Sequence, residues 1–364
     1  MLKSDVNELK KRFSKDGHNI DRIAGCYVNC DKTKVGVFKR DFLDLEEDEQ
    51  TMYFDIAKKC LAGKIDNNLI VLDFPLEAEN NGGAQHSLLG LRNSALKVDE
   101  VLESFYDKII ASFSCSENYM ILLFHDIYDV PVKTKDKQNI GESEETYEYI
   151  LCALCPVDLG KAALGFDTEE KNISIINGSW VTKGPESAFL FPSFEERSAD
   201  IHKVVLYTKK STEPHKELME VLMGCDIVET EDEIRANFDS IASTAFEGSI
   251  DNSDEINDMV LLIHKGLYDK LEEHNATFKG TSDENILKVT EDILTEVIED
   301  VTDDEDVKDD ILSAYKEMYG EKDIYISKLV DIKRLEKEAL RLENMALKKK
   351  VARLMKQIKG NLEG

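Results

Sequence analysis

His125, Asp126 and Asp129 are the residues whose types best suit catalysis, and they fall at the end of the apolar run "YMILLFHDIYDV". Catalytic groups often lie on loops next to strands, where a rigid scaffold positions them. Neither a G-x-S-x-G nucleophile motif nor an H-E-x-x-H helix accompanies them in the sequence. We therefore favour turn and capping roles and predict no catalytic residue. A hydrolase or nuclease that uses the three is the less favoured alternative.

Cys152 and Cys155 stand three apart in "ILCALCPV" and raise the question of a metal or redox site. A structural zinc site takes four ligands, usually as two pairs on tight turns. Residues three apart on a strand point to opposite faces, which is wrong for holding one ion. Pro156 does not provide the helix N-terminus that stabilises a reactive thiolate. We predict that both cysteines fill the core, and we predict no metal and no cofactor. Redox and metal roles are the minor alternatives.

The stretch "FLFPSFEERSADIHKVVLYTKK" surrounds Pro192 with phenylalanines and then turns acidic at Glu195. Acidic groups suit the first turn of a helix because they complement its dipole. This pattern predicts a strand followed by a helix, with helical spacing over 195–223. The alternative is that this junction presents Arg197 to a partner or ligand.

The C-terminal segment has the heptad spacing of a coiled coil. The apolar seam is Leu340, Leu347 and Leu354 at the d positions, with Asn344, Val351 and Ile358 at the a positions. Leucine at d with one polar Asn at a favours a parallel two-stranded coil in a fixed register. In such a dimer Glu336 would face Arg341 of the second copy, and Glu343 would face Lys348. We predict a homodimer, and the alternative is a helix that packs on its own domain.

Charge is spread unevenly along the chain. The net charge is −28, with 74 acidic and 46 basic residues, and this repels nucleic acid at long range. Residues 333–359 hold ten Lys or Arg and three Glu, a net of +7, so the remainder carries −35. Five basic residues are candidates for contact with nucleic acid or a protein partner. They are Arg197, Lys348, Lys349, Lys350 and Arg353.

The hydrophobic patterns predict an α+β fold, in which a mixed sheet with flanking helices is followed by a helical domain and a C-terminal coiled-coil helix. We expect three parts: 1–212 as the α+β domain, 213–332 as an acidic helical domain and 333–364 as a basic coiled-coil helix. The helices expected in the second part are 231–246, 252–273, 284–301 and 305–319. Between the strands of "NYMILLFHDIYDV" and "EYILCALCPV" we expect a charged loop over 133–146.

The 364 residues include no apolar run near the roughly 20 needed to span a bilayer. The N-terminus has no apolar signal-peptide core, and the seven cysteines are an odd number without an export signal. We therefore expect a cytoplasmic protein without membrane contact.

Several phrases of the sequence resemble an uncharacterised bacterial family of domains of unknown function (DUF4317-like). They are "DVNELKKRF", "RIAGCYVN", "LRNSALK", "YDVP", "YILCALCPV" and "FLFPSFEERSADIHKVVLYT". The resemblance covers roughly residues 1–330 and ends near Lys333. Members of that family continue into a β-rich tail, whereas this chain continues into the basic helix. The resemblance implies no activity.

The order of the elements is also similar to that of the nucleoid-associated NdpA family. The similarity includes the helix "EVLESFYDKIIASF", the two strands after it, and "IHKVVLYTKKSTEPHKELMEVLMGC" before an acidic helical region. This likeness implies an association with DNA. Our leading hypothesis is a non-enzymatic, nucleoid-associated-like dimer. The alternative is an acidic interaction or regulatory factor that engages a basic protein or mimics DNA.

Overall fold

The computed structural model divides the chain into two compact units, Met1–Thr230 and Glu231–Gly364. The residues described are 1–133, 139–160, 163–167, 172–176, 180–281, 283–320, 322–345, 347, 348, 351 and 355, with side chains described outside 132–144 and 161–180. The first unit has two hydrophobic cores and the second has one, and no core draws residues from both units.

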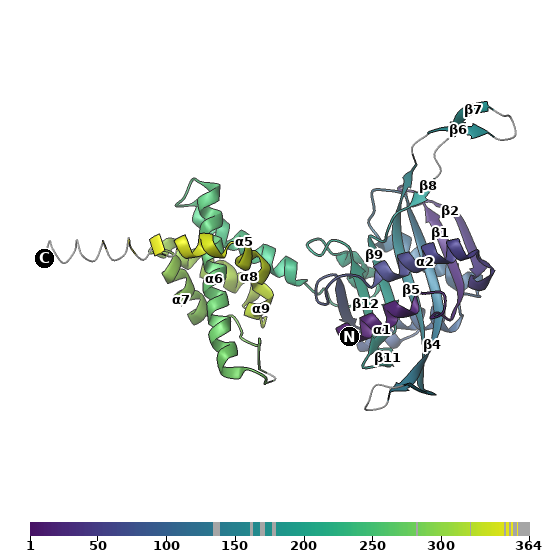
Figure 1. Cartoon of the computed structure of the whole chain (residues 1–364), viewed down its shortest axis with the longest axis horizontal. Coiled ribbons are helices and arrows are strands. Elements are labelled where there is room, and N and C mark those ends of the chain that lie inside the picture. The colour runs from purple at the N-terminus through teal and green to yellow at the C-terminus, as the bar shows by residue number, and fades with distance from the viewer. Residues whose placement is uncertain are drawn as a thin grey trace. The chain divides into compact units, whose positions relative to one another are not determined.

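The first unit is built on one large sheet (Figure 1). The strand order is β2-β1-β4-β5-β9-β12-β3, and β8 pairs with the end of β5. Every pairing between described strands of this sheet is antiparallel. The strands are β1 (Ile20–Val28), β2 (Lys34–Asp41), β3 (Leu69–Asp73), β4 (Tyr119–Lys133), β5 (Asn139–Leu159), β8 (Trp180–Thr182), β9 (Ser187–Phe191) and β12 (Lys203–Thr208).

Both faces of this sheet are covered, because its central strands are apolar on both sides. Successive side chains of a strand alternate between faces, so each central strand contributes to two cores. One core holds α3 (Ala84–Asn93) and α4 (Asp99–Ser112) against one face. The other holds α1 (Lys3–Arg12) and α2 (Glu47–Cys60), which lie in front of the sheet in Figure 1.

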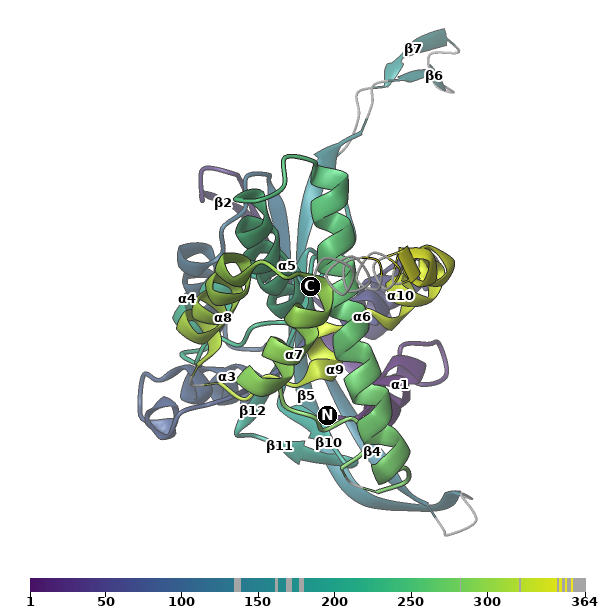
Figure 2. The ribbon, with the colours of Figure 1, turned by 90° about the vertical axis from the view of Figure 1, so that its left-hand side faces the viewer.

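The second unit is helical, and α6 is its longest helix in Figures 1 and 2. Polar N-caps begin four of its described helices, because the side chains of Asn252, Thr290, Asp304 and Asp331 each accept a hydrogen bond from the backbone of the first turn. The helices are α5 (Glu231–Glu247), α6 (Ser253–Phe278), α7 (Glu291–Val301), α8 (Glu305–Tyr319), α9 (Ile326–Leu329) and α10 (Ile332–Lys337). The predicted α+β fold with a helical part after the sheet is confirmed.

The segment expected as a loop over 133–146 is largely strand. β4 extends to Lys133 and β5 begins at Asn139. Thr146 donates from its hydroxyl to Asp129 across the two strands, at 3.1 Å. Paired backbone therefore extends into a polar sequence that carries no apolar alternation, and this is why the pattern did not indicate a strand.

The helix expected over 195–223 is wrong over its first half. A short hairpin, β10 (Ser193–Glu195) with β11 (Ser198–Asp200), precedes β12. Further along, the π-helical turn η3 (Leu218–Leu222) packs in the same core as α4. That turn belongs to the first unit, so the boundary between the two compact units falls after Thr230. The sequence had suggested a boundary after residue 212.

Candidate functional site

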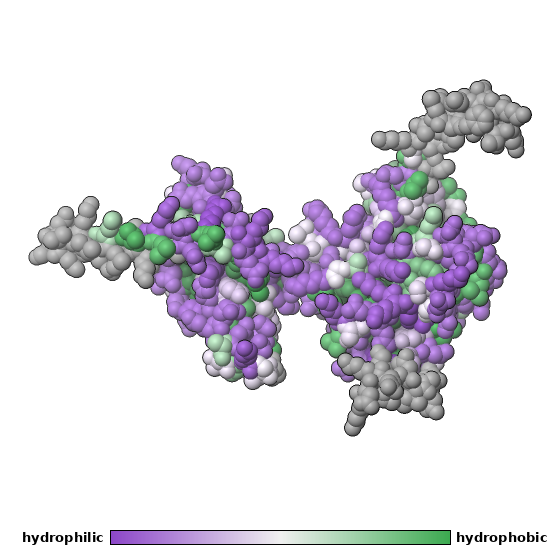
Figure 3. Space-filling model, viewed as in Figure 1, coloured by the Kyte–Doolittle hydropathy of each residue, from purple (hydrophilic) through white to green (hydrophobic). Residues whose placement is uncertain are grey.

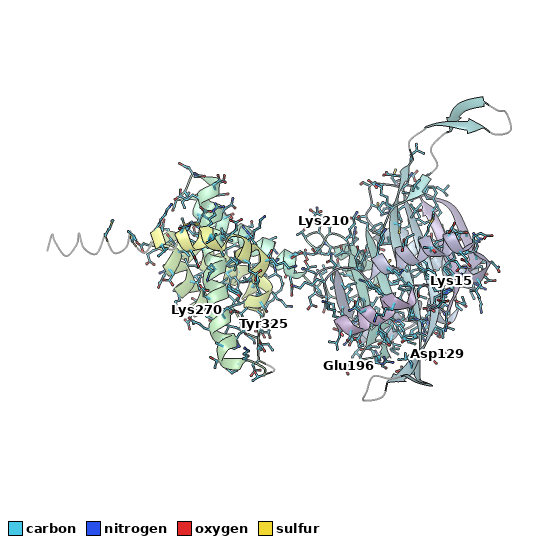
Figure 4. All side chains as sticks on the ribbon, in the orientation of Figure 1. Lys15, Asp129, Glu196, Lys210, Lys270 and Tyr325 are labelled. Carbon is cyan, nitrogen blue, oxygen red and sulfur yellow. The ribbon has the colours of Figure 1, made fainter. Side chains whose placement is uncertain are left out.

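The three candidate catalytic residues lie on β4 without converging. His125 and Asp126 are neighbours along one strand, so their side chains project to opposite faces of the sheet. Both are buried, with 1 % and 0 % exposed. Asp129 is exposed where β4 leaves the body of the unit (Figure 4). These positions do not form the shared cleft that hydrolysis by the three would need.

His125 lies between two carboxylates from the neighbouring strands. Its Nδ1 is 2.6 Å from Asp21 Oδ1 and its Nε2 is 2.9 Å from Glu148 Oε1. Burial alone would lower the pKa of His125, but the hydrogen bonds and charges of the two carboxylates outweigh burial and raise it. The protonated ring can donate from both nitrogens at once. The group therefore ties β1, β4 and β5 together as a charged structural bridge.

Asp126 is the centre of a second buried polar group, on the other face. Its carboxylate accepts hydrogen bonds from Arg12 Nη2 at 2.9 Å to each oxygen, from the Tyr149 hydroxyl at 2.6 Å and from the Asn19 backbone at 3.0 Å. Buried charges persist when they are paired and hydrogen-bonded. These contacts anchor the C-terminal end of α1 on the sheet, which is a structural role.

Cys152 and Cys155 are fully buried in different cores. Cys152 packs with α3 and α4, and Cys155 packs with α1 and α2, as predicted for residues three apart on a strand. Burial raises the pKa of Cys152 far above its ordinary value and that of Cys155 to about 12. Both thiols are therefore neutral and poor ligands. Among the residues that the structure describes, no group of three or more His, Cys, Asp or Glu is placed to hold a metal ion.

Arg197 lies in the turn between β10 and β11, not at the start of a helix. Its guanidinium donates to both oxygens of Glu8 on α1, at 2.8 and 2.9 Å, and to the Pro131 carbonyl. Its side chain is 19 % exposed. The expected contact residue is thus engaged within its own unit, where it links the hairpin to α1 and β4.

The described part of the C-terminal helix packs on its own unit through one face. Helical backbone continues over 339–345 after a turn at Glu338. Leu342 is 2 % exposed and joins the core of the helical unit, and Met345 packs against that core. Arg341 forms an ion pair with Asp258 of α6. The described part of this helix therefore packs on its own unit, as in the alternative to the coiled coil.

The opposite face of the same helix is apolar and exposed. Leu340 is 78 % exposed, Leu347 61 % and Val351 49 %. Asn344 is also exposed and donates from its side chain to the Leu340 carbonyl at 2.9 Å. Figure 3 shows the apolar surface along this helix, next to the grey atoms. These four residues are the described members of the predicted a and d positions, and we call them the seam.

Not all predicted contact residues can be placed. Lys348 is exposed and forms no ion pair with any described residue. Lys349, Lys350, Arg353, Leu354 and Ile358 lie outside the described residues. Sequence reasoning missed Asp21 and Glu148 as partners of His125, since only the register of three strands brings them together.

None of the helices in the described ranges combines the length and apolar character needed to cross a membrane. A comparison with curated proteins found no match. The likeness to the nucleoid-associated NdpA family receives no support from the comparisons.

The comparison with protein families found a match to the family described as "Domain of unknown function (DUF4317)" over residues 1–359. The match includes the basic helix, so the expectation that the resemblance ends near Lys333 was wrong. The family's common sequence thus extends through the seam and its lysine-rich flanks. The chain belongs to the DUF4317 family.

Proposed function

We propose that this protein is a non-enzymatic, cytoplasmic dimer that associates with DNA in the manner of a nucleoid-associated protein. In this proposal the C-terminal helix supplies both the dimer seam and the cationic surface. The observation that carries it is the exposure of the seam, because exposed apolar side chains at successive a and d positions of one helix are typical of a surface that a second helix covers.

The helix has two apolar faces, which fits a position between its own unit and a partner. Leu342 covers the core of its own unit while Leu340 and Leu347 are exposed. Burying a Leu or Val side chain contributes roughly 1.5–3 kcal/mol, and two copies would bury six from the described part of the seam. Association costs about 4–15 kcal/mol, so the remaining a and d positions and the flanking charges must add to this sum.

The occupant we propose is a second copy, because the flanks are complementary to themselves. Glu343 and Lys348 are both exposed and occupy positions that face each other in a parallel pair. Arg341 would face Glu336 in the same way, although it also pairs with Asp258 within its own chain. The lysine-rich remainder of each helix would then lie side by side and double the local positive charge.

Light scattering on the full chain tests the dimer. We expect the mass of two copies at micromolar concentration for the natural chain and of one copy for Leu347→Glu, because a buried carboxylate in the seam has no partner. Met318→Glu is the matched control, since Met318 is an exposed apolar residue of the same unit, outside the seam. A single-copy mass for the natural chain would end the proposal.

Gel-shift titration with duplex DNA tests the second part. DNA binding through phosphate contacts weakens as the salt concentration rises. The steepness of a plot of log binding constant against log salt concentration falls by about 0.9 for each phosphate contact that is lost. The double change Lys348→Gln with Lys349→Gln should lower the slope by up to about 1.8. The control pair Lys58→Gln with Lys59→Gln, two lysines exposed on α2, should leave it unchanged. Absence of any shift at low salt contradicts DNA association.

The charge outside the basic helix favours one other function. Residues other than 333–359 carry a net −35, which suits a surface that engages a basic protein or mimics DNA. Under this alternative the full chain recovers basic proteins in a low-salt pull-down, and Lys348→Gln with Lys349→Gln leaves that recovery unchanged. Recovery of no basic protein would exclude it.

A further inference from the structure

A cavity of about 510 Å³ lies between α1 and the segment that links α2 to β3. Three lysines line it: Lys3 and Lys10 from α1 and Lys64 from the linking segment. None of the described residues that line it is acidic. The chain has 74 acidic and 46 basic residues, so a wall that includes three lysines and no acidic residue differs from the overall composition.

Lys10 is the most buried of the three lysines that line this cavity. It is partly buried and forms no hydrogen bond or ion pair with any described residue. Burial lowers the pKa of Lys10, and no neighbouring carboxylate opposes that effect. A cation that is withdrawn from water without a counterion destabilises the fold, so a bound anion would offset the cost.

Apart from the lysines, Asn7 and Gly63, the residues that line the cavity are apolar. Val6 and Leu69 are 5 % and 1 % exposed, and Ile65 is half-buried. The volume falls in the range of about 300–1,000 Å³ that small-molecule sites occupy. Lysines at an apolar wall suit a ligand that joins an anionic group to an apolar or aromatic body.

The walls are fixed by contacts outside the cavity. Asn68 donates from its side chain to the Thr208 carbonyl at 3.1 Å and accepts from the Lys64 backbone at 3.2 Å, so the linking segment is held on β12. Gly63 has φ +96°, and a Cβ there would meet the Asn68 side chain at 2.3 Å. On the other side Arg12 holds α1 through Asp126. The site is therefore preorganised.

We propose that this cavity binds a small organic phosphate through Lys3, Lys10 and Lys64. A phosphate monoester carries a charge of about −1.5 to −2 at neutral pH, which suits three lysines that line one cavity better than a single carboxylate does. The inference is independent of dimerisation and of DNA binding, because the cavity lies wholly within residues 3–69 of the first unit.

Pyridoxal 5′-phosphate, followed by borohydride, is the test on the full chain. Its aldehyde forms an imine with a neutral lysine amine, and reduction fixes the product for mapping by mass spectrometry. We expect Lys10 to be modified at least fivefold more than Lys58, an exposed lysine of α2. Pyridoxal without the phosphate should show no such preference. Excess inorganic phosphate should reduce the labelling.

The variant Lys64→Gln keeps Lys10 but removes part of the phosphate contact. It should lower labelling of Lys10 by pyridoxal 5′-phosphate at least fivefold, whereas Lys58→Gln should not. Circular dichroism on both variants reports whether the fold is retained. Labelling of Lys10 no greater than that of Lys58, or equal labelling with and without the phosphate, would overturn the proposal whatever the outcome with DNA.

Discussion

The group around Asp126 shows how much of this chain's candidate chemistry is structural. Asp126→Asn keeps the shape but leaves the buried guanidinium of Arg12 without its charge partner. Breaking a buried ion pair from one side costs about 3–5 kcal/mol, so we expect a loss of that order in the free energy of unfolding by urea. Asp129→Asn, on the same strand but exposed, should change it by no more than about 0.5 kcal/mol. Equal effects of the two substitutions would contradict this account.

The bridge at His125 makes stability depend on pH in a definite direction. The pKa of His125 is raised in the folded chain, so protonation favours folding. The stabilisation is fully present below the unfolded pKa of about 6.5 and is lost as the pH rises through the folded value. We therefore compare the free energy of unfolding by urea of the natural chain with that of His125→Gln. The natural chain should be the more stable of the two, and the difference should be larger at about pH 5.5 than at about pH 8.5.

The titration of Asp21 does not reverse the direction of this pH dependence. Burial opposes ionisation of Asp21, but the hydrogen bond and charge of His125 outweigh it and lower the pKa of this carboxyl. It therefore remains ionised across the range that His125 titrates. A difference between the two proteins that is constant with pH, or that grows as the pH rises, would show that the bridge is not charged in the folded chain.

Alternation along a strand was enough to predict that Cys152 and Cys155 face different cores. The same reasoning could not reach Asp21 or Glu148, because the register between strands depends on shifts such as the one between Ile20 and Arg22. It also could not find the lysines of the cavity, which come together only when α1 lies beside the segment before β3.

At the scale of the elements, the β10–β11 hairpin was predicted wrongly, because the sequence indicated a helix there. Glu196 and Arg197 both have positive φ, +48° and +70°, in the two-residue turn. Such turns favour Asn or Gly, and the acidic pair at Glu195 suggested a helix start instead. By contrast, the starts of α6 and α8 were predicted closely, because the caps Asn252 and Asp304 mark them. The helix expected over 284–301 begins only at Glu291, after the cap Thr290, so its predicted start was wrong.

The hairpin offers a stabilising substitution. Glu196 is exposed at the edge of the unit in Figure 4, and its carboxylate makes no hydrogen bond or ion pair with a described residue. Glu196→Asn should therefore relieve strain at positive φ and raise the free energy of unfolding by roughly 0.5–1 kcal/mol. Glu220→Asn, at an exposed position in η3, serves as a control for the loss of one negative charge. A lower thermal midpoint for Glu196→Asn would show that the carboxylate does more than occupy the turn.

At the scale of the whole molecule, the two units separate the two proposed properties. The lysine cavity and the buried polar groups of β4 lie in Met1–Thr230, whereas every position of the seam lies in Glu231–Gly364. The sequence placed a boundary after 212 because the patterns beyond it are almost entirely helical, but the apolar side chains of η3 belong to the core beneath α4. Composition could not reveal which core they join.

This separation predicts that each unit folds alone and that only one of them pairs. A fragment of residues 231–364 keeps its complete core and should give a cooperative thermal transition with the mass of two copies in light scattering. A fragment of residues 1–230 should fold as a single copy, because its cores are closed by α1 to α4. If the full chain pairs while 231–364 stays single, the interface must include the first unit. The fragment contains the whole seam, so a single-copy mass would mean that the seam does not pair by itself. The seam would then be refuted as the dimer contact, although the full chain is a dimer.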